Sequence, residues 1–275
     1  MKIREALLDA TTRLAPVSAT PRLDAELLMA EALGVSRAAL LLGRLGEAAP
    51  PAFDPLVRRR LADEPIAYIL GRRAFWTIEL AVGPGVLVPR ADSETLIEAA
   101  VAHFGAAGPA RILDLGTGPG TLLLAALDQW PAATGLGVDA SAEALAYARG
   151  NAERLGLAGR AEFALGDWGE GLAGRFDLIL CNPPYVEAGA TLPADVANWE
   201  PAAALYAGAD GLDVYRRLAP QLRRLLASAG IACLEVGVGQ QSQVRGIFLS
   251  EGFTMESRSD LNGIARCLIA TADPR

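Results

Sequence analysis

The N-terminal part of the chain has apolar residues at helical spacing and no alternation typical of a strand. One of these segments has a clear start and stop. Thr20 can cap the helix, Pro21 suits its first position, and Gly34 can take the left-handed conformation that ends it. The helical patterns cover residues 5–15, 20–34, 36–43 and 54–64. We therefore predict a small helical bundle over residues 1–73.

The period of the pattern then changes to two. Between Trp76 and Val82, large apolar side chains alternate with Thr77, Glu79 and Ala81. A Gly-Pro-Gly turn at 83–85 leads into a second extended run. This pattern predicts a β-hairpin that links two parts of the chain over residues 74–90.

Short apolar strands and amphipathic helices alternate through the rest of the chain, which we assign to a second domain over residues 91–275. The alternation predicts a mostly parallel α/β sheet with helices on both faces, whose ligands bind at the carboxyl ends of the strands. Residues 186–210 form one long connection, a candidate lid or binding loop. The predicted strands are 111–115, 134–139, 161–167, 176–181, 231–238 and 265–272, and the predicted helices are 121–130, 141–156, 213–228 and 240–252.

Composition and charge narrow the class of protein. Hydrophobic residues make up 52% of the 275 residues and charged residues 21%, as in an ordered globular protein. No apolar run reaches the roughly 20 residues of a membrane helix, and acidic residues stand where a signal peptide would be apolar, so we expect a cytoplasmic protein that binds no membrane. The net charge is -7, of which residues 74–275 carry 14 basic and 23 acidic groups, a balance that repels nucleic acid.

The cysteines and the only histidine offer no metal site. Cys181, Cys233 and Cys267 each lie alone in an apolar stretch, without the spacing of a metal site or of a disulfide framework. We expect them to be buried small hydrophobic residues. His103 lies in a predicted helix away from the strand ends, and we expect it to be structural or exposed.

A glycine-rich segment follows the first strand of the large domain and opens a helix. Glycines let a backbone approach a ligand closely, and the start of a helix offers free N–H groups. The spacing is GxGxG rather than the GxGxxG of dinucleotide sites, and Pro119 removes one of the amides that would hold a pyrophosphate, so a ligand without a diphosphate fits better. The candidate cofactor residues here are Asp114, Gly116, Thr117, Gly118, Pro119 and Gly120.

The next two strands end in residues that suit a nucleoside. Asp139 ends the second strand, where a carboxylate accepts hydrogen bonds from ribose hydroxyls. Asp167 and Trp168 end the third, one as an acceptor for an exocyclic amine and the other as a flat face for a purine. Singly, a glycine-rich turn is more often just a turn, an Asp at a strand end more often a helix cap, and a Trp more often a core residue. Their order along successive strands favours a nucleoside site.

The fourth strand ends on Asn182-Pro183-Pro184-Tyr185. Pro183 disfavours the helical region for Asn182, and prolines donate no hydrogen bond, so the corner is rigid and rich in acceptors. The Asn182 side-chain oxygen and the Pro183 carbonyl can accept both hydrogens of a planar NH2 group, on which the Tyr185 ring can stack. A strand-terminating turn is the alternative. The neighbouring nucleoside site favours chemistry on an amide or a nucleobase amino group.

Almost the whole chain resembles the S-adenosylmethionine-dependent glutamine-N5 methyltransferases that modify peptide chain release factors. Besides the glycine segment and NPPY, the similar segments are 64–76, 86–98, 151–157, 199–218, 234–240 and 260–266. The resemblance implies a helical domain that docks on the release factor, a hairpin linker, and a class I Rossmann-like methyltransferase domain with a seven-stranded, mostly parallel sheet whose last strand is antiparallel. The family usually has Pro-Glu-Thr-Glu after the Pro-Arg of the linker, where this chain has Ala91-Asp92-Ser93-Glu94, so we assign no role to Asp92 or Glu94.

The resemblance also implies the reaction and the site. A methyl group passes from S-adenosylmethionine to the side-chain amide nitrogen of the glutamine in the Gly-Gly-Gln loop of class-one release factors, leaving S-adenosylhomocysteine, without a metal. Asn182, Pro183 and Tyr185 are the expected catalytic residues. Pro184 joins them in binding substrate, and Asn182 also borders the cofactor. We expect a monomer that binds release factors and has no direct contact with nucleic acid.

Three alternatives remain at this point. A related glutamine methyltransferase acts on a large-subunit ribosomal protein and shares NPPY, but it differs in the N-terminal region. An amino-methyltransferase of DNA or RNA needs a basic groove or a target-recognition domain, which the acidic charge of the large domain opposes. A protein that binds S-adenosylmethionine or a release factor without turnover would not need an intact NPPY.

Overall fold

The computed structural model describes residues 1–272, and the chain divides into two compact units. The smaller unit comprises Met1–Arg72 together with Leu192–Trp199. The larger comprises Arg73–Thr191 and Glu200–Arg275. The sequence patterns placed 192–199 in the large domain, whereas in the structure this part of the long connection folds with the helical unit.

The smaller unit is helical throughout. Its core is made of the apolar faces of α1 (Ile3–Leu14), α2 (Pro21–Leu33) and α4 (Phe53–Leu61), with Leu7, Leu28 and Met29 fully buried. Gly34 has a φ of 64° and ends α2 as the sequence predicted, but the Thr20 hydroxyl bonds to the Asp24 carboxylate instead of capping the backbone. The elements are α1 Ile3–Leu14, α2 Pro21–Leu33, α3 Arg37–Ala39, a π-helical turn Leu40–Arg44, α4 Phe53–Leu61, α5 Ile66–Leu70 and, from the long connection, α9 Ala194–Ala197.

The hairpin lies earlier in the chain than its pattern predicted. β1 Arg72–Phe75 and β2 Ile78–Ala81 form a two-stranded sheet, so the tight turn is at Trp76 and not at Gly-Pro-Gly 83–85. Trp76 takes a φ of 53°, and its N–H donates to the Glu94 carboxylate at 2.9 Å. Residues 86–89 form no strand. The buried Glu200 carboxylate, rather than a neighbouring strand, accepts the N–H of Val88 at 3.0 Å.

The larger unit contains the predicted seven-stranded, mostly parallel sheet, in the order β5-β4-β3-β6-β7-β9-β8. β9 runs antiparallel to both β7 and β8. The sequence pattern missed β8, an edge strand in which only Phe253 and Met255 are buried, so its alternation is too short to recognise. The strands are β3 Arg111–Leu115, β4 Thr134–Asp139, β5 Ala161–Leu165, β6 Phe176–Cys181, β7 Leu226–Glu235, β8 Phe253–Ser259 and β9 Ala265–Ala272.

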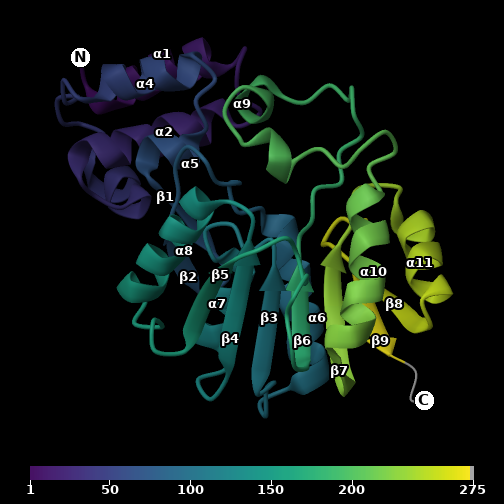
Figure 1. Cartoon of the computed structure of the whole chain (residues 1–275). Coiled ribbons are helices and arrows are strands. Elements are labelled where there is room, and N and C mark those ends of the chain that lie inside the picture. Colours follow the sequence, from purple (N-terminus) through teal and green to yellow (C-terminus); the bar gives the residue numbers. More distant parts are fainter. Residues whose placement is uncertain (273–275) are drawn as a thin grey trace. The chain divides into compact units, whose positions relative to one another are not determined.

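Helices cover both faces of this sheet (Figure 1). The pair α10 Asp213–Leu225 and α11 Gln241–Ser250 packs on one face, where Tyr215 and Phe248 are fully buried. The other face is covered by α6 Glu94–Phe104, α7 Thr121–Gln129 and α8 Ala142–Arg154. The parallel strands therefore all end at the same edge of the sheet, and their loops form one continuous rim.

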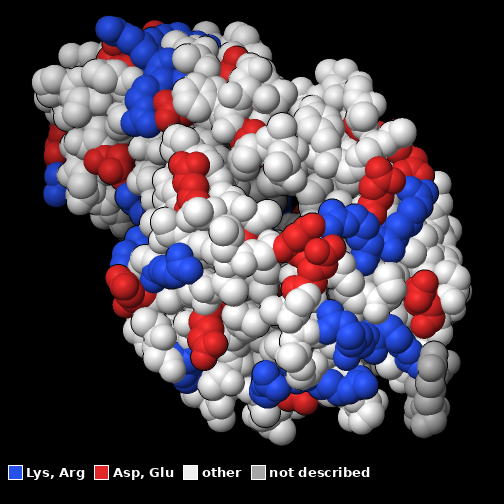
Figure 2. Space-filling view, viewed as in Figure 1, with Lys and Arg blue, Asp and Glu red and all other residues white. Residues whose placement is uncertain are grey.

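Charged side chains are interleaved over α10 (Figure 2). Arg216 pairs with Asp210 and Asp213, and Arg217 pairs with Asp167. Arg224 donates to the Gly169 carbonyl at 2.8 Å. These arginines are thus committed to partners within the unit. None of the helices within residues 1–272 has the length and apolar character needed to cross a bilayer.

Candidate active site

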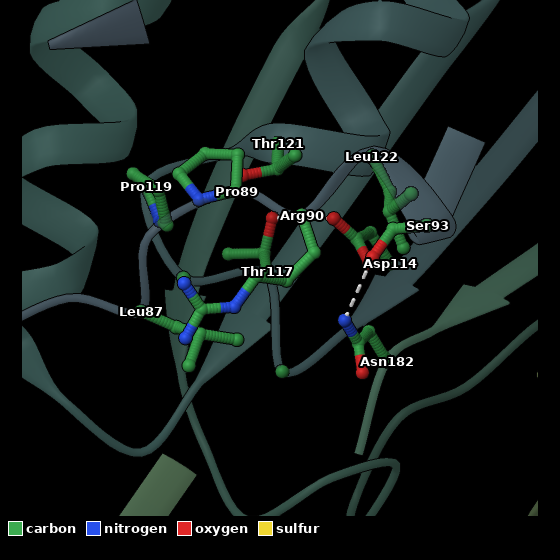
Figure 3. Close-up of a pocket in the computed structure, with 12 residues that line it drawn as sticks. Leu87, Pro89, Arg90, Ser93, Asp114, Thr117, Pro119, Thr121, Leu122 and Asn182 are labelled. Atoms are coloured by element: carbon green, nitrogen blue, oxygen red, sulfur yellow. Dashed lines mark hydrogen bonds between the residues drawn. The ribbon is translucent and has the colours of Figure 1, made fainter. Parts of the chain in front are cut away.

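A pocket opens at the carboxyl ends of β3 and β6 (Figure 3). It encloses about 390 Å³, counting the space that is open to solvent. The segment that follows β2 forms one side of it, through Leu87, Pro89, Arg90 and Ser93. The residues predicted from the sequence that line it are Asp114, Gly116, Thr117, Gly118, Pro119 and Asn182. The structure therefore brings the glycine segment and the start of NPPY into one cavity.

Asp114 places a buried carboxylate in the wall of this pocket. Its Oδ2 accepts hydrogen bonds from the Thr117 hydroxyl at 2.7 Å and from the Leu123 N–H at 3.1 Å. Its Oδ1 is buried and has no hydrogen-bond partner among the residues described. Burial raises the pKa of Asp114 to about 7. A cationic group of a ligand would both satisfy Oδ1 and favour its charge.

The glycine segment makes a tight turn that Trp168 and Asp139 support. Gly116 has a φ of 73°, and a Cβ there would lie 3.1 Å from Cζ3 of the Trp168 ring, so only glycine fits. The Gly118 N–H donates to the Asp139 carboxylate at 2.8 Å, and the other Asp139 oxygen accepts from the Ser141 N–H at 2.9 Å. Each of these carboxylate oxygens keeps a lone pair for a further donor. Asp139 thus stabilises the turn and has acceptor capacity left for a ligand hydroxyl.

The two residues predicted after β5 separate in the structure. Trp168 has a φ of 54°, a conformation that is uncommon for a bulky residue, and its ring packs against Gly116. The exposed Asp167 carboxylate instead pairs with Arg217 at 2.5 Å. The role of Asp167 as an acceptor for the adenine amine remains a prediction, and Arg217 would compete with the adenine for this carboxylate.

Asn182 is oriented by a side chain from the short 3-10 turn Ala91–Ser93, which lies between the linker and α6. Its Nδ2 donates to the Ser93 hydroxyl at 3.1 Å, the bond drawn in Figure 3. The Ser93 hydroxyl in turn donates to the carboxylate of Glu235, which also accepts from the Tyr185 hydroxyl at 3.3 Å. The Asn182 side-chain oxygen is left to accept a hydrogen bond from another group. Pro183 and Pro184 are buried, and Tyr185 is partly buried.

Several residues that shape this site could not be recognised from local sequence pattern. Glu200 is buried and accepts from Arg90 at 2.6 Å, so it holds the linker in place. Ser93 and Glu235 lie in segments that resemble the family. A single Ser or Glu in the sequence, however, does not show which side chain it will bond to in the fold. The two acids left without a role have structural partners: Asp92 pairs with Arg266 at 2.8 Å, and Glu94 accepts from the Trp76 N–H.

The remaining sequence candidates lie outside the pocket. His103 is exposed near the end of α6 and packs edge-on against Phe104. Cys181, Cys233 and Cys267 are free and buried, as predicted. Within residues 1–272, no group of three or more His, Cys, Asp or Glu is arranged to hold a metal ion.

The sheet order, the glycine turn after β3 and the Asn at the end of β6 define a Rossmann-like methyltransferase. Comparison with known proteins agrees, since a model described as a methyltransferase domain matches residues 108–255. A methyltransferase structure from Pyrococcus furiosus covers 79% of this chain and 98% of its own, with a TM-score of 0.55 at 18% identity, which supports the fold.

Sequence comparison identifies the family. A model of the PrmC N-terminal domain matches residues 5–71. The release factor glutamine methyltransferase of Rhodospirillum rubrum is 46% identical over 91% of this chain and 78% of its own length. That of Caulobacter vibrioides is 40% identical over 92% of this chain and 90% of its own. The chain therefore belongs to the release factor glutamine methyltransferase family.

Proposed function

We propose that this chain transfers a methyl group from S-adenosylmethionine to the side-chain amide nitrogen of the glutamine in the Gly-Gly-Gln loop of class-one peptide chain release factors. Family membership supports this substrate. The observation that carries the proposal is the orientation of Asn182: its NH2 group is engaged by Ser93, so its oxygen is the atom presented to an incoming NH2 group.

Residues that line the pocket and residues that support its glycine turn fit the cofactor. When bound, S-adenosylmethionine supplies a methyl group on a positively charged sulfur, and S-adenosylhomocysteine is left after transfer. Asp114 offers a buried, unpartnered carboxylate oxygen suited to an ammonium group. Asp139 offers acceptors for ribose hydroxyls, and Gly116 and Gly118 let the backbone approach the ligand. Trp168 supplies the flat face that suits a purine.

Positioning and electrostatics drive the reaction, because an amide nitrogen is a poor nucleophile. The Asn182 oxygen and the Pro183 carbonyl accept hydrogen bonds from the substrate NH2, and these bonds strengthen as the nitrogen gains positive character. The Tyr185 ring stacks on the amide plane and holds it in line for displacement. The methylated amide nitrogen then loses one proton to solvent, which leaves a neutral N-methyl amide. No metal and no covalent enzyme intermediate are required.

The partner is a protein, not a nucleic acid. The helical unit is proposed to dock on the release factor, as the resemblance implies. Over α10, the arginines at 216 and 217 are paired with acidic side chains, so they do not form the row of available cations that binds phosphates (Figure 2). We propose a monomer acting in the cytoplasm, where translation termination takes place.

A labelled-transfer experiment tests the function. The protein is incubated with labelled S-adenosylmethionine and a purified class-one release factor, or with the same factor carrying Ala in place of the loop glutamine. Peptide mass mapping should find one added methyl on the Gly-Gly-Gln glutamine and none in the variant. Parallel reactions with ribosomal proteins and unmethylated DNA test the other substrates. Label on a ribosomal protein or on DNA instead would identify that class of molecule as the substrate. Cofactor binding without any methyl transfer would indicate a binding protein.

A further inference from the structure

We propose that Glu235 is a positioning residue for the proposed reaction: acting through Ser93, it sets which end of the Asn182 amide faces the substrate, and it also holds the Tyr185 hydroxyl. The inference rests on the proposed function and deepens it. Glu235 was not among the residues expected to act from the sequence, and it lies outside the lining of the pocket.

Glu235 is placed for this role by the sheet. It is the last residue of β7, the strand beside β6, so its side chain lies next to the corner that begins at Asn182. It is 1% exposed. One carboxylate oxygen accepts from the Ser93 hydroxyl and the other from the Tyr185 hydroxyl at 3.3 Å. A carboxylate this deeply buried is costly unless its oxygens are used.

The chemistry of these groups determines the direction of every hydrogen bond. An ionised carboxylate only accepts, so the single hydrogen of the Ser93 hydroxyl must point to Glu235. The Ser93 oxygen can then only accept from Asn182, and the Asn182 amide must turn its NH2 group towards it. The Asn182 oxygen is therefore left for the substrate. With the Asn182 amide reversed, its NH2 group would face the NH2 group of the substrate, and no hydrogen bond could form between two donors.

The segment 234–240 also holds Tyr185 in other ways. The Gln240 side-chain NH2 donates to the Tyr185 carbonyl at 2.9 Å, and the Gln240 side-chain oxygen accepts from the Gly237 N–H at 3.1 Å. A Cβ at Gly237 would lie 3.0 Å from the Tyr185 ring and 2.6 Å from the Gln240 oxygen, so a side chain here would displace one of these groups. The end of β7 thus supports both functional side chains of the corner.

The charge of Glu235 responds to its surroundings. Burial raises its pKa to about 7, while the hydrogen bonds from Ser93 and Tyr185 lower it. Asp92 raises this pKa further, and Arg266 lowers it. At pH 8 the carboxylate is therefore ionised, the state in which it only accepts.

The test removes the relay without touching the substrate-binding atoms. Ser93→Ala loses the hydroxyl, whereas Ser93→Thr keeps it. With saturating cofactor and release factor at pH 8, we expect kcat to fall at least about tenfold in Ser93→Ala and to stay near the wild-type value in Ser93→Thr. Cofactor Kd should stay within about twofold in both, because neither variant alters Asp114, Asp139 or the glycine turn, which are the proposed cofactor contacts. Tyr215→Phe is the control: it removes a 2.8 Å hydrogen bond to the Glu235 backbone carbonyl and should leave kcat unchanged.

A double variant tests that Glu235 acts through Ser93. Glu235→Gln keeps the shape of the side chain but has only one acceptor oxygen. The Ser93 and Tyr185 hydroxyls each need an acceptor, so one of the two loses its partner. Its loss of kcat in the Ser93→Ala background should be clearly smaller than its loss in the wild type, since the path through Ser93 is already gone. The proposal would be overturned if the fold-loss of kcat in the double variant equalled the product of the losses in the two single variants. A wild-type kcat in Ser93→Ala would also overturn it. If Glu235→Gln folds poorly, the Ser93 pair alone decides. A wild-type enzyme that transfers no methyl to glutamine would instead overturn the proposed function.

Discussion

The side-chain NH2 of Asn182 donates a 3.1 Å hydrogen bond to the hydroxyl of Ser93, which lies 89 residues earlier in the chain. The turn Ala91–Ser93 before α6 and the residue after β6 thus meet at one corner. The Asn182 oxygen remains for the substrate, and the orientation of this amide is central to the proposed catalysis.

Replacing this amide should affect the rate and not cofactor binding. Asn182→Ala removes a preorganised acceptor, so kcat should fall about 100-fold, while cofactor affinity stays within a few-fold of the wild type. Single-turnover methyl transfer and calorimetric titration of the cofactor measure the two effects separately. Full activity in this variant would remove Asn182 from the mechanism.

Asp139 should instead matter for cofactor binding. Asp139→Ala removes acceptors proposed for the ribose and the 2.8 Å hydrogen bond that supports the glycine turn. The binding free energy should weaken by roughly 1 to 3 kcal/mol. Asp128→Ala is a matched control, because that exposed carboxylate accepts from the Thr77 hydroxyl away from the glycine turn. Equal affinities by calorimetry in the two variants would place the ribose carboxylate elsewhere.

Asp114 should make cofactor binding depend on pH. Burial and, to a smaller extent, the nearby charge of Asp139 raise its pKa, the hydrogen bonds from Thr117 and Leu123 lower it, and the net value is about 7. The carboxylate is therefore charged above pH 7 and becomes neutral as the pH falls below it. Affinity for a cationic ligand should drop as the pH is lowered from 8 to 6, approaching about tenfold per pH unit at the acid end.

The variant Asp114→Asn isolates this effect. It cannot ionise, so it should bind the cofactor more weakly than the wild type at pH 8 and show little change between pH 8 and 6. Calorimetric titrations of both proteins at pH 6, 7 and 8 give the comparison. A wild-type affinity that is the same at pH 6 and pH 8 would contradict the proposed contact with the cofactor cation.

Within the helical unit, Arg60 should hold the segment 192–199. Its guanidinium is 5% exposed and pairs with the buried Asp24 at 3.0 Å and with Asp195 at 3.2 Å. Arg60→Met leaves Asp24 buried without its partner, so the free energy of unfolding should fall by roughly 3 to 5 kcal/mol. Asp195→Ala should cost less than about 1 kcal/mol, because that carboxylate is 33% exposed.

Urea unfolding measures the stability of both variants, and hydrogen exchange follows the segment. Amides of residues 192–199 should exchange faster in Asp195→Ala than in the wild type, even though its overall stability is nearly unchanged. Unchanged exchange would mean that other contacts hold this segment to the helical unit.

The sequence alone determined the features that depend on local pattern and on the order of elements along the chain. Helical and alternating periods predicted the bundle and the order of strands and helices in the sheet. The glycine turn and NPPY can each be recognised from the sequence because consecutive residues create their geometry. Since parallel strands end at one edge of a sheet, that order also predicted that the glycine turn and Asn182 would meet.

Only the tertiary structure decided the contacts that join distant segments. The hairpin turns at Trp76 instead of Gly83-Pro84-Gly85, and there the Glu94 carboxylate accepts the Trp76 N–H; the segment 192–199 folds with the helical unit and contacts it through Arg60. The hydrogen bonds that join Ser93 to Asn182 and Glu235 exist only because β7 lies beside β6 and the turn Ala91–Ser93 packs against the ends of both strands. A hydrogen bond depends on distance and angle between atoms, and these are set by packing across the whole sheet, whereas a local pattern records only which neighbours a residue has along the chain.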